Sequence, residues 1–177
     1  MGGEGIEEVY NMKKFIKFLI FLIVMGGLIY YLYSYLGIRI YKIDGTSMVP
    51  TFKNGELVIS MKDYNIQRHD IVVYKYKNAN VIKRVIGLPN ETIDIKEEGS
   101  VYVNNELLKE NYLVSTTNPG EITYPHNMDV GEYFVIGDNR LDSFDSRYVQ
   151  VGNININNIK GRVVFSINTF RIFKHEK

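Results

Sequence analysis

The chain has 177 residues, no cysteine and a net charge of +1. The length suits one ordinary domain with an appendage, and the missing thiol excludes disulfides, cysteine nucleophiles and cysteine-ligated metals. The balanced charge argues against a protein that binds nucleic acid through charge alone. The histidines share no short motif, so we predict no metal site and expect them on the surface or in loops. They are His69, His126 and His175.

The first predicted element is a transmembrane helix over residues 18–38, preceded by a cytoplasmic tail of residues 1–17. The run has 21 residues and no charge, and a helix of this length can cross a bilayer. A chain of this size can hardly wrap a helix that is apolar on every face. A cleaved signal peptide is disfavoured because the run ends in tyrosines rather than small residues. Three lysines before the run and two basic residues after it favour a single-pass protein of the cell membrane whose N-terminus lies on the cytoplasmic side.

Residues 39–177 predict a single β-rich domain on the extracytoplasmic face. Short runs rich in β-branched and aromatic residues alternate with turn residues, and no long 3.6-residue period is present. The runs are residues 38–43, 56–60, 70–76, 81–87, 92–95, 100–103, 133–136 and 161–167. Residues 155–160 favour one short helical turn. We therefore expect a mainly β fold, an antiparallel sheet or open barrel, with about residues 96–130 as a polar insertion or flap.

The first candidate motif, DGTSMVPT at residues 44–51, directly follows the predicted membrane segment. Gly45 permits unusual backbone angles and Pro50 stiffens the exit of the turn. Such a turn can hold the Ser47 hydroxyl exposed at a strand end. Taken alone, the motif is more typical of an ordinary turn serine than of a nucleophile.

The second motif, VIKRVIGLP at residues 81–89, places Lys83 inside an apolar strand. An edge-strand lysine that points into water is the common case. A lysine buried in apolar surroundings has a pKa below its ordinary value of about 10.4, because burial disfavours the ammonium form. Such an amine can act as a general base near neutral pH.

The third motif, GDNRLDSFDSR at residues 137–147, follows an apolar strand. It is either a solvated charged loop or an interlocked one. Asp145 could pair with Arg147, or one of the aspartates could pair with Arg140. A serine hydroxyl in this loop could then orient a lysine amine.

Together, in this order behind an anchor, the three motifs resemble those of the type I signal peptidases, membrane-anchored serine proteases with a Ser–Lys dyad. The resemblance covers residues 12–168 and implies the signal peptidase fold, with no cofactor or metal. It implies removal of signal peptides from exported preproteins, with the lipid bilayer and the secretion machinery nearby and no nucleic acid. The lysine of the second motif resembles the bacterial branch, and the single anchor the smaller Gram-positive enzymes.

The resemblance also implies roles for individual residues. Ser47 matches the nucleophile, Lys83 the general base and Ser143 the serine that orients the lysine amine. Asp145 and Arg147 match a structural ion pair. Gly45 stands where some relatives have a serine that helps the oxyanion hole, so we assign the oxyanion to backbone N–H groups of Ser47 and Gly45. The candidate substrate-pocket residues are Tyr41, Ile43, Met48, Phe52 and Ile82.

A second departure is Asn90, where the family often has glycine; asparagine also tolerates a positive φ, so we expect no loss of function. An autoproteolytic repressor of the SOS type shares the dyad but needs a DNA-binding segment, whereas this chain has an anchor. A peptidase dedicated to one pilin or operon partner remains open from the sequence. A catalytically silent, membrane-anchored binding protein is the non-enzyme alternative, against which the intact Ser47, Lys83 and Ser143 argue.

Overall fold

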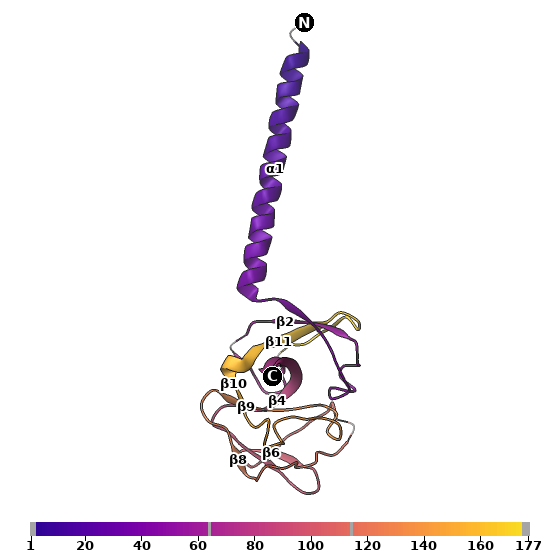
Figure 1. Cartoon of the computed structure of the whole chain (residues 1–177), viewed down its shortest axis with the longest axis vertical. Helices are drawn as coiled ribbons and strands as arrows, with labels where there is room; N and C mark the ends of the chain where they lie inside the picture. The colour runs from indigo at the N-terminus through magenta and orange to yellow at the C-terminus, as the bar shows by residue number, and fades with distance from the viewer. Residues whose placement is uncertain (1–2, 64, 114, 175–177) are drawn as a thin grey trace. The chain divides into compact units, whose positions relative to one another are not determined.

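The structure is a computed structural model that describes residues 3–63, 65–113 and 115–174, with side chains described from Tyr10 onward (Figure 1). His175 lies outside the described residues. The chain divides into two units, residues 1–37 and residues 38–177. The second unit contains all of the residues that the sequence predicts for the β domain.

The first unit is one continuous helix, α1 (Gly3–Leu36). Its segment Tyr10–Leu36 is long and apolar enough to cross a membrane, and none of it is buried inside the protein. The helix therefore extends back into the predicted tail and ends two residues before the predicted limit of the span. It ends there because Gly37 adopts a φ of 58° and its N–H turns back to the Ser34 carbonyl at 3.3 Å, as glycine commonly does after a helix.

The second unit is built on a large antiparallel sheet, which confirms the predicted fold class. In spatial order its strands are β1 (Arg39–Lys42), β2 (Leu57–Met61), β11 (Ile159–Ser166), β3 (Ile71–Tyr76), β4 (Ala79–Gly87), β9 (Glu132–Ile136) and β10 (Ile154–Asn155), with β12 (Arg171–Ile172) paired to β11. The order is an open path from β1 to β10. A single 3-10 turn, η1 (Ile156–Asn158), lies within the stretch where one helical turn is expected.

The predicted flap is a small second sheet rather than an irregular loop. Its strands, in order, are β7 (Glu106–Leu107), β6 (Val101–Val103), β5 (Thr92–Ile95) and β8 (His126–Asn127). It starts at Thr92, earlier than expected, because β5 pairs with β6 rather than with the large sheet. Asn104 and Asn105 take φ values of 50° and 69°, as a tight hairpin between β6 and β7 requires. Figure 1 shows β6 and β8 at one end of the β unit.

The turn between β1 and β2 is held by the hydrophobic core. Met48 is 2% exposed and Phe52 is fully buried, and both pack in a cluster with Ile43, Val58 and other residues of the large sheet. Because these side chains are anchored on both sides of the turn, the backbone around Ser47 has little freedom. Elsewhere, Asn90 has a φ of 64°, the positive value that its position is expected to require.

Candidate active site

The structure brings Ser47 and Lys83 together although they are 36 residues apart in the sequence. Ser47 lies in the turn after β1, and Lys83 lies within β4, opposite Val72 of β3. The Lys83 Nζ atom is 2.5 Å from the Ser47 Oγ atom. Ser47 is partly exposed, so its hydroxyl can be reached from solvent while it contacts the amine.

Lys83 is buried, and only 4% of the surface of the residue is exposed. Burial lowers its pKa from 10.5 to about 8; the carboxylate of Asp145 opposes this shift and the guanidinium of Arg147 adds to it. At neutral pH about one tenth of such amines are uncharged. A lysine amine with its pKa lowered in this way is a better candidate for a general base near neutral pH than an exposed lysine.

A cavity of about 240 Å³ opens beside this pair. Its walls include three of the residues that the sequence predicts for the pocket, Ile43, Met48 and Ile82. Phe52 is a correction, because it is fully buried in the core, where its ring meets Phe173 edge-on at 5.1 Å. Tyr41 is half-buried and is not among the residues that line this cavity, and its contact with substrate stays a prediction.

Two strand edges border the cavity and are free to bind another chain. Within the described ranges, β1 pairs with β2 and with no other strand, while residues 79–83 of β4 pair with β3 alone. The pairing of β4 with β9 begins only at Arg84. The cavity is lined by residues 42–44, at the end of β1 and just after it, and by residues 79–83 of β4. An extended peptide placed between them can add to the sheet through backbone hydrogen bonds.

The third motif forms an interlocked, buried loop. Asp145 is fully buried, and its carboxylate accepts hydrogen bonds from Arg147 Nε at 2.8 Å and Nη2 at 2.9 Å. The same carboxylate accepts from the Ser143 hydroxyl at 2.6 Å and from the Gly137 N–H at 3.0 Å. Of the pairings left open by the sequence, Arg147 thus takes Asp145, whereas Arg140 pairs with Glu110, a residue of the flap.

Gly137 is the point at which this loop meets the nucleophile turn. A Cβ atom added to it would overlap Ser143 Oγ and would lie 2.5 Å from the Ser47 carbonyl oxygen, so only glycine fits. The Ser47 carbonyl accepts the N–H of Asn139 at 3.0 Å, and the Thr46 hydroxyl donates to Asp142. The Ser143 hydroxyl and the Ser47 carbonyl therefore both lie against Gly137, where a larger residue would place its side chain.

A second buried ion pair lies behind the site, and the sequence reasoning missed it. Arg84 Nε and Nη2 bind the two carboxylate oxygens of Asp138 at 2.7 and 2.6 Å, and the Thr51 hydroxyl donates to the same carboxylate at 2.5 Å. Arg84, Asp138 and Thr51 together join all three motifs, because each of these residues comes from a different motif. The opposite charges beside Lys83 and Gly137 were the available clue.

The predicted oxyanion donors need one correction. The Gly45 N–H already donates to the Asn54 side-chain oxygen at 3.1 Å, so it is not available to a substrate. For the Ser47 N–H, no hydrogen bond to another described residue is seen. Ser47 thus keeps a backbone donor next to its own hydroxyl, whereas Gly45 contributes only its φ of 88° to the turn.

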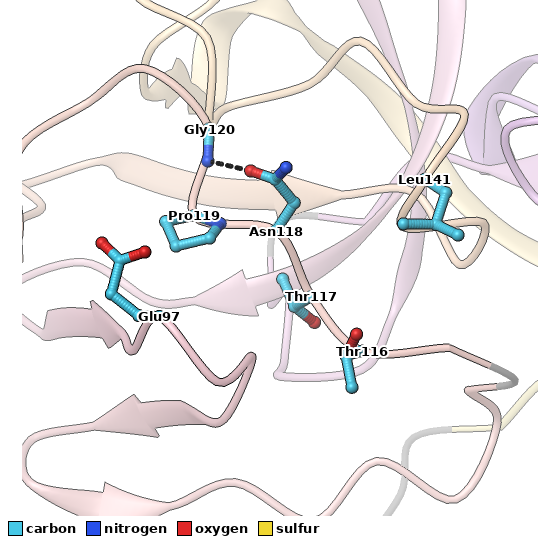
Figure 2. Close-up of a pocket in the computed structure, with 7 residues that line it drawn as sticks. All are labelled: Glu97, Thr116, Thr117, Asn118, Pro119, Gly120 and Leu141. Carbon is cyan, nitrogen blue, oxygen red and sulfur yellow. Dashed lines mark hydrogen bonds between the residues drawn. The ribbon is translucent and has the colours of Figure 1, made fainter.

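A larger hollow, of about 360 Å³, lies between the flap and the third motif (Figure 2). Glu97 is the only titratable residue among the seven that line it. The Asn118 side-chain oxygen accepts a hydrogen bond from the Gly120 N–H at 2.8 Å. Leu141 forms the wall on the side of the third motif. The hollow holds neither Ser47 nor Lys83, so the smaller cavity is the one equipped for covalent chemistry.

A serine hydroxyl in contact with a buried amine, beside strand edges that can receive an extended chain, is the arrangement of a serine peptidase with a lysine base. Comparison with known proteins agrees. The family model described as signal peptidase, peptidase S26 matches residues 12–168. The chain belongs to this family, and its apolar helix places it at a membrane.

Individual relatives cover most of the chain. Signal peptidase I V of Bacillus subtilis is 40% identical over 68% of this chain and 80% of that protein. Signal peptidase IB of Staphylococcus aureus is 32% identical over 93% of this chain and 95% of that protein. A crystal structure of a signal peptidase I from Enterococcus faecalis matches with a TM-score of 0.47 and 31% identity, covering 55% of this chain and 96% of that one.

Proposed function

We propose that this protein is a membrane-anchored endopeptidase that removes signal peptides from exported preproteins, with Ser47 as nucleophile and Lys83 as general base. The observation that carries the proposal is the 2.5 Å contact between the Ser47 hydroxyl and an amine that burial has made a usable base. Family membership supplies the reaction class and the kind of substrate.

In the proposed reaction, the Ser47 oxygen attacks the scissile carbonyl while Lys83 Nζ accepts the hydroxyl proton. The Ser47 N–H donates to the oxyanion that forms. When the C–N bond breaks, Lys83 returns the proton to the leaving amine, and the signal peptide stays bound to Ser47 as an ester. Water then attacks the ester, again with Lys83 as base, and frees both the serine and the signal peptide.

The proposed role of the third motif is to hold Lys83 ready for this transfer. Arg147 and Asp145 lock each other, and Asp145 fixes the direction in which the Ser143 hydroxyl donates. The Ser143 oxygen keeps lone pairs that can accept a hydrogen bond from the lysine amine. Ser143 then orients the Lys83 amine, and the ion pair of Asp145 with Arg147 orients the Ser143 hydroxyl.

The substrate is proposed to bind as an extended strand between β1 and residues 79–83 of β4. The apolar walls of Ile43, Met48 and Ile82 suit small uncharged side chains before the cleavage point. We further propose that the N-terminus lies inside the cell, since Lys13, Lys14 and Lys17 precede the apolar run. The β domain, which follows α1 directly, is then on the extracytoplasmic face, where signal peptides emerge.

The test is cleavage of preproteins by the full chain reconstituted in phospholipid vesicles, with the products identified by mass spectrometry. A single cut behind a small residue at the end of the apolar region is expected. A panel that includes secretory preproteins and a pilin precursor separates a general enzyme from a dedicated one. No cleavage of any member by an enzyme whose Ser47 and Lys83 are intact contradicts the proposal.

The pH dependence of the same reaction is expected to report on Lys83. Because its pKa is about 8, kcat/KM should be flat above that pH and fall about tenfold per pH unit below it, as the amine becomes protonated. The rate therefore rises with pH through the pKa of the base. Initial rates from pH 6 to 10 measure this, and a limb centred near pH 10 contradicts a buried lysine base.

A further inference from the structure

The loop between β7 and β8 reaches across to the third motif and binds it through charged and polar side chains. We call its residues 110–113 and 115–118 the strap. No role follows for this segment from the sequence, which has the polar character of a surface insertion. In the structure, strap residues contact Arg84, Arg140 and Arg147, the arginines of the second and third motifs.

The central contact of the strap is a buried ion pair between Glu110 and Arg140. The side chain of Arg140 is fully buried and that of Glu110 is 6% exposed. Arg140 Nη1 donates to Glu110 Oε2 at 3.0 Å, and Nη2 donates to Oε1, so the pair is bidentate. A guanidinium held in this way needs its carboxylate, because an uncompensated charge in the interior is strongly unfavourable.

Arg140 passes this constraint to the catalytic loop. Its Nε atom donates to the Gly137 carbonyl at 3.0 Å, and its own carbonyl accepts Arg147 Nη1 at 2.9 Å. Gly137 is the residue against which Ser143 Oγ and the Ser47 carbonyl both lie. The position of the Arg140 side chain therefore sets the position of the loop that faces Ser47.

A second arm of the strap reaches the strand that carries Lys83. The Tyr112 hydroxyl donates to Glu110 Oε1 at 2.7 Å, and the Tyr112 ring lies 3.9 Å from the guanidinium carbon of Arg84. Arg84 follows Lys83 directly and is bound to Asp138 of the third motif. Glu110 is thus linked to the loop that faces Ser47 through Arg140, and to the strand that carries Lys83 through Tyr112.

The strap closes around the third motif at its other end. The Thr117 hydroxyl accepts from Arg140, and the Asn118 carbonyl accepts from Arg147 Nη1 at 3.0 Å. Figure 2 shows Thr117 and Asn118 on one stretch of loop, with Leu141 of the third motif on the other side of the hollow. None of the strap residues lines the cavity beside Ser47.

We infer that Glu110 is a positioning residue for peptide cleavage, which holds Arg140 and Tyr112 so that the third motif stays in register with Ser47 and Lys83. The inference rests on the proposed function of that pair. Since the strap does not touch the cavity that receives the substrate, its loss should disturb the chemical step and leave binding intact. A misplacement of reacting groups by about 1 Å can cost on the order of 10²-fold in rate.

The experiment compares Glu110→Gln, Glu110→Asp and the control Glu106→Gln, an exposed glutamate in β7 of the same sheet. Each full-length enzyme is assayed in vesicles on one preprotein, and kcat and KM are obtained per folded enzyme from circular dichroism at the assay temperature. For Glu110→Gln we expect kcat to fall about 10- to 100-fold and KM to stay within about twofold. Glu110→Asp, which keeps the charge, should recover part of kcat, and the control should match the wild type.

A wild-type kcat per folded molecule for Glu110→Gln overturns the inference, and so does a change confined to KM. If Glu110→Gln does not fold, Tyr112→Phe decides: it removes the hydroxyl that donates to Glu110 and lies 3.2 Å from His69 Nδ1, and kcat should fall severalfold at constant KM. An unchanged kcat in Tyr112→Phe then overturns the inference. Failure of the wild type to cut any preprotein is a different result, which contradicts the proposed function itself.

Discussion

Replacing Lys83 with methionine is expected to abolish preprotein cleavage and, at the same time, to stabilise the folded protein. Loss of activity follows because Ser47 loses the only base that contacts its hydroxyl among the described residues. Removing one member of a nucleophile–base pair lowers kcat by about 10⁴- to 10⁶-fold in serine proteases. The preprotein assay in vesicles measures this effect.

The gain in stability follows from the lowered pKa of Lys83. The pKa is 10.5 in the unfolded reference and about 8 in the folded state, so between these values the unfolded chain binds more protons and stability rises with pH. Below pH 8 the folded protein carries the full cost of a buried ammonium, about 3 kcal/mol. Methionine has a similar unbranched shape without the charge. Its advantage in urea unfolding should be greatest below pH 8 and shrink toward pH 10.

Two comparisons make these expectations specific. Ser47→Ala combined with Lys83→Met should be no slower than either single variant, since the two residues act as one unit. Lys75→Met, at an exposed position of β3, should change neither activity nor stability. Substantial cleavage by Lys83→Met contradicts the assignment of the base, and a variant less stable than the wild type at pH 7 contradicts the cost assigned to the buried amine.

Replacing Arg147 with methionine is expected to destabilise the protein by about 3–5 kcal/mol and to remove most activity. Asp145 has no exposed surface, and without the guanidinium its buried carboxylate would keep only the Ser143 hydroxyl and the backbone N–H groups of Gly137 and residue 147 as donors. Arg147 also donates to the carbonyls of Asn118 and Arg140, which would lose their partner. Urea unfolding at pH 7 measures the loss.

A double-mutant cycle separates the ion pair from the other contacts of Arg147. Asp145→Asn combined with Arg147→Met should cost less than the sum of the single changes, because each single change leaves one buried charge unpaired and the double change leaves none. Lys96→Met, in the exposed pair with Asp94, serves as the control and should leave stability nearly unchanged. Additive costs in the cycle, or an Arg147→Met protein as stable as the wild type, would show that the pair does not hold this loop.

The local features of this protein could be predicted well from the sequence. Strands such as β3 and β4 are runs of β-branched and aromatic residues, whose preference for extended backbone needs no distant partner. The apolar helix follows from the length of an uncharged run. Motifs around Ser47 and Lys83 marked the candidate site because each combines an unusual residue with a defined turn or strand. The family resemblance built on them is confirmed by the family model.

Contacts across the fold were harder to predict. Glu110 lies in a polar stretch with no pattern that links it to Arg140, and the pairing exists only because the small sheet folds back onto the third motif. For the same reason the sequence assigned Phe52 to the pocket, although the turn directs its ring into the core. It also made Gly45 an oxyanion donor, whereas Asn54 returns to bind that N–H.

The sequence by itself determined the class of fold, the anchor and the residue types that can perform acyl transfer. Tertiary structure alone decided whether those residues are competent. A lysine becomes a base near neutral pH only when other segments exclude water from it, and its pKa of about 8 reflects burial by residues from several strands and loops. Net charge, the first property of the chain, gives no sign of this. The charges that matter are buried in pairs, and their burial depends on packing between segments that are distant in the sequence.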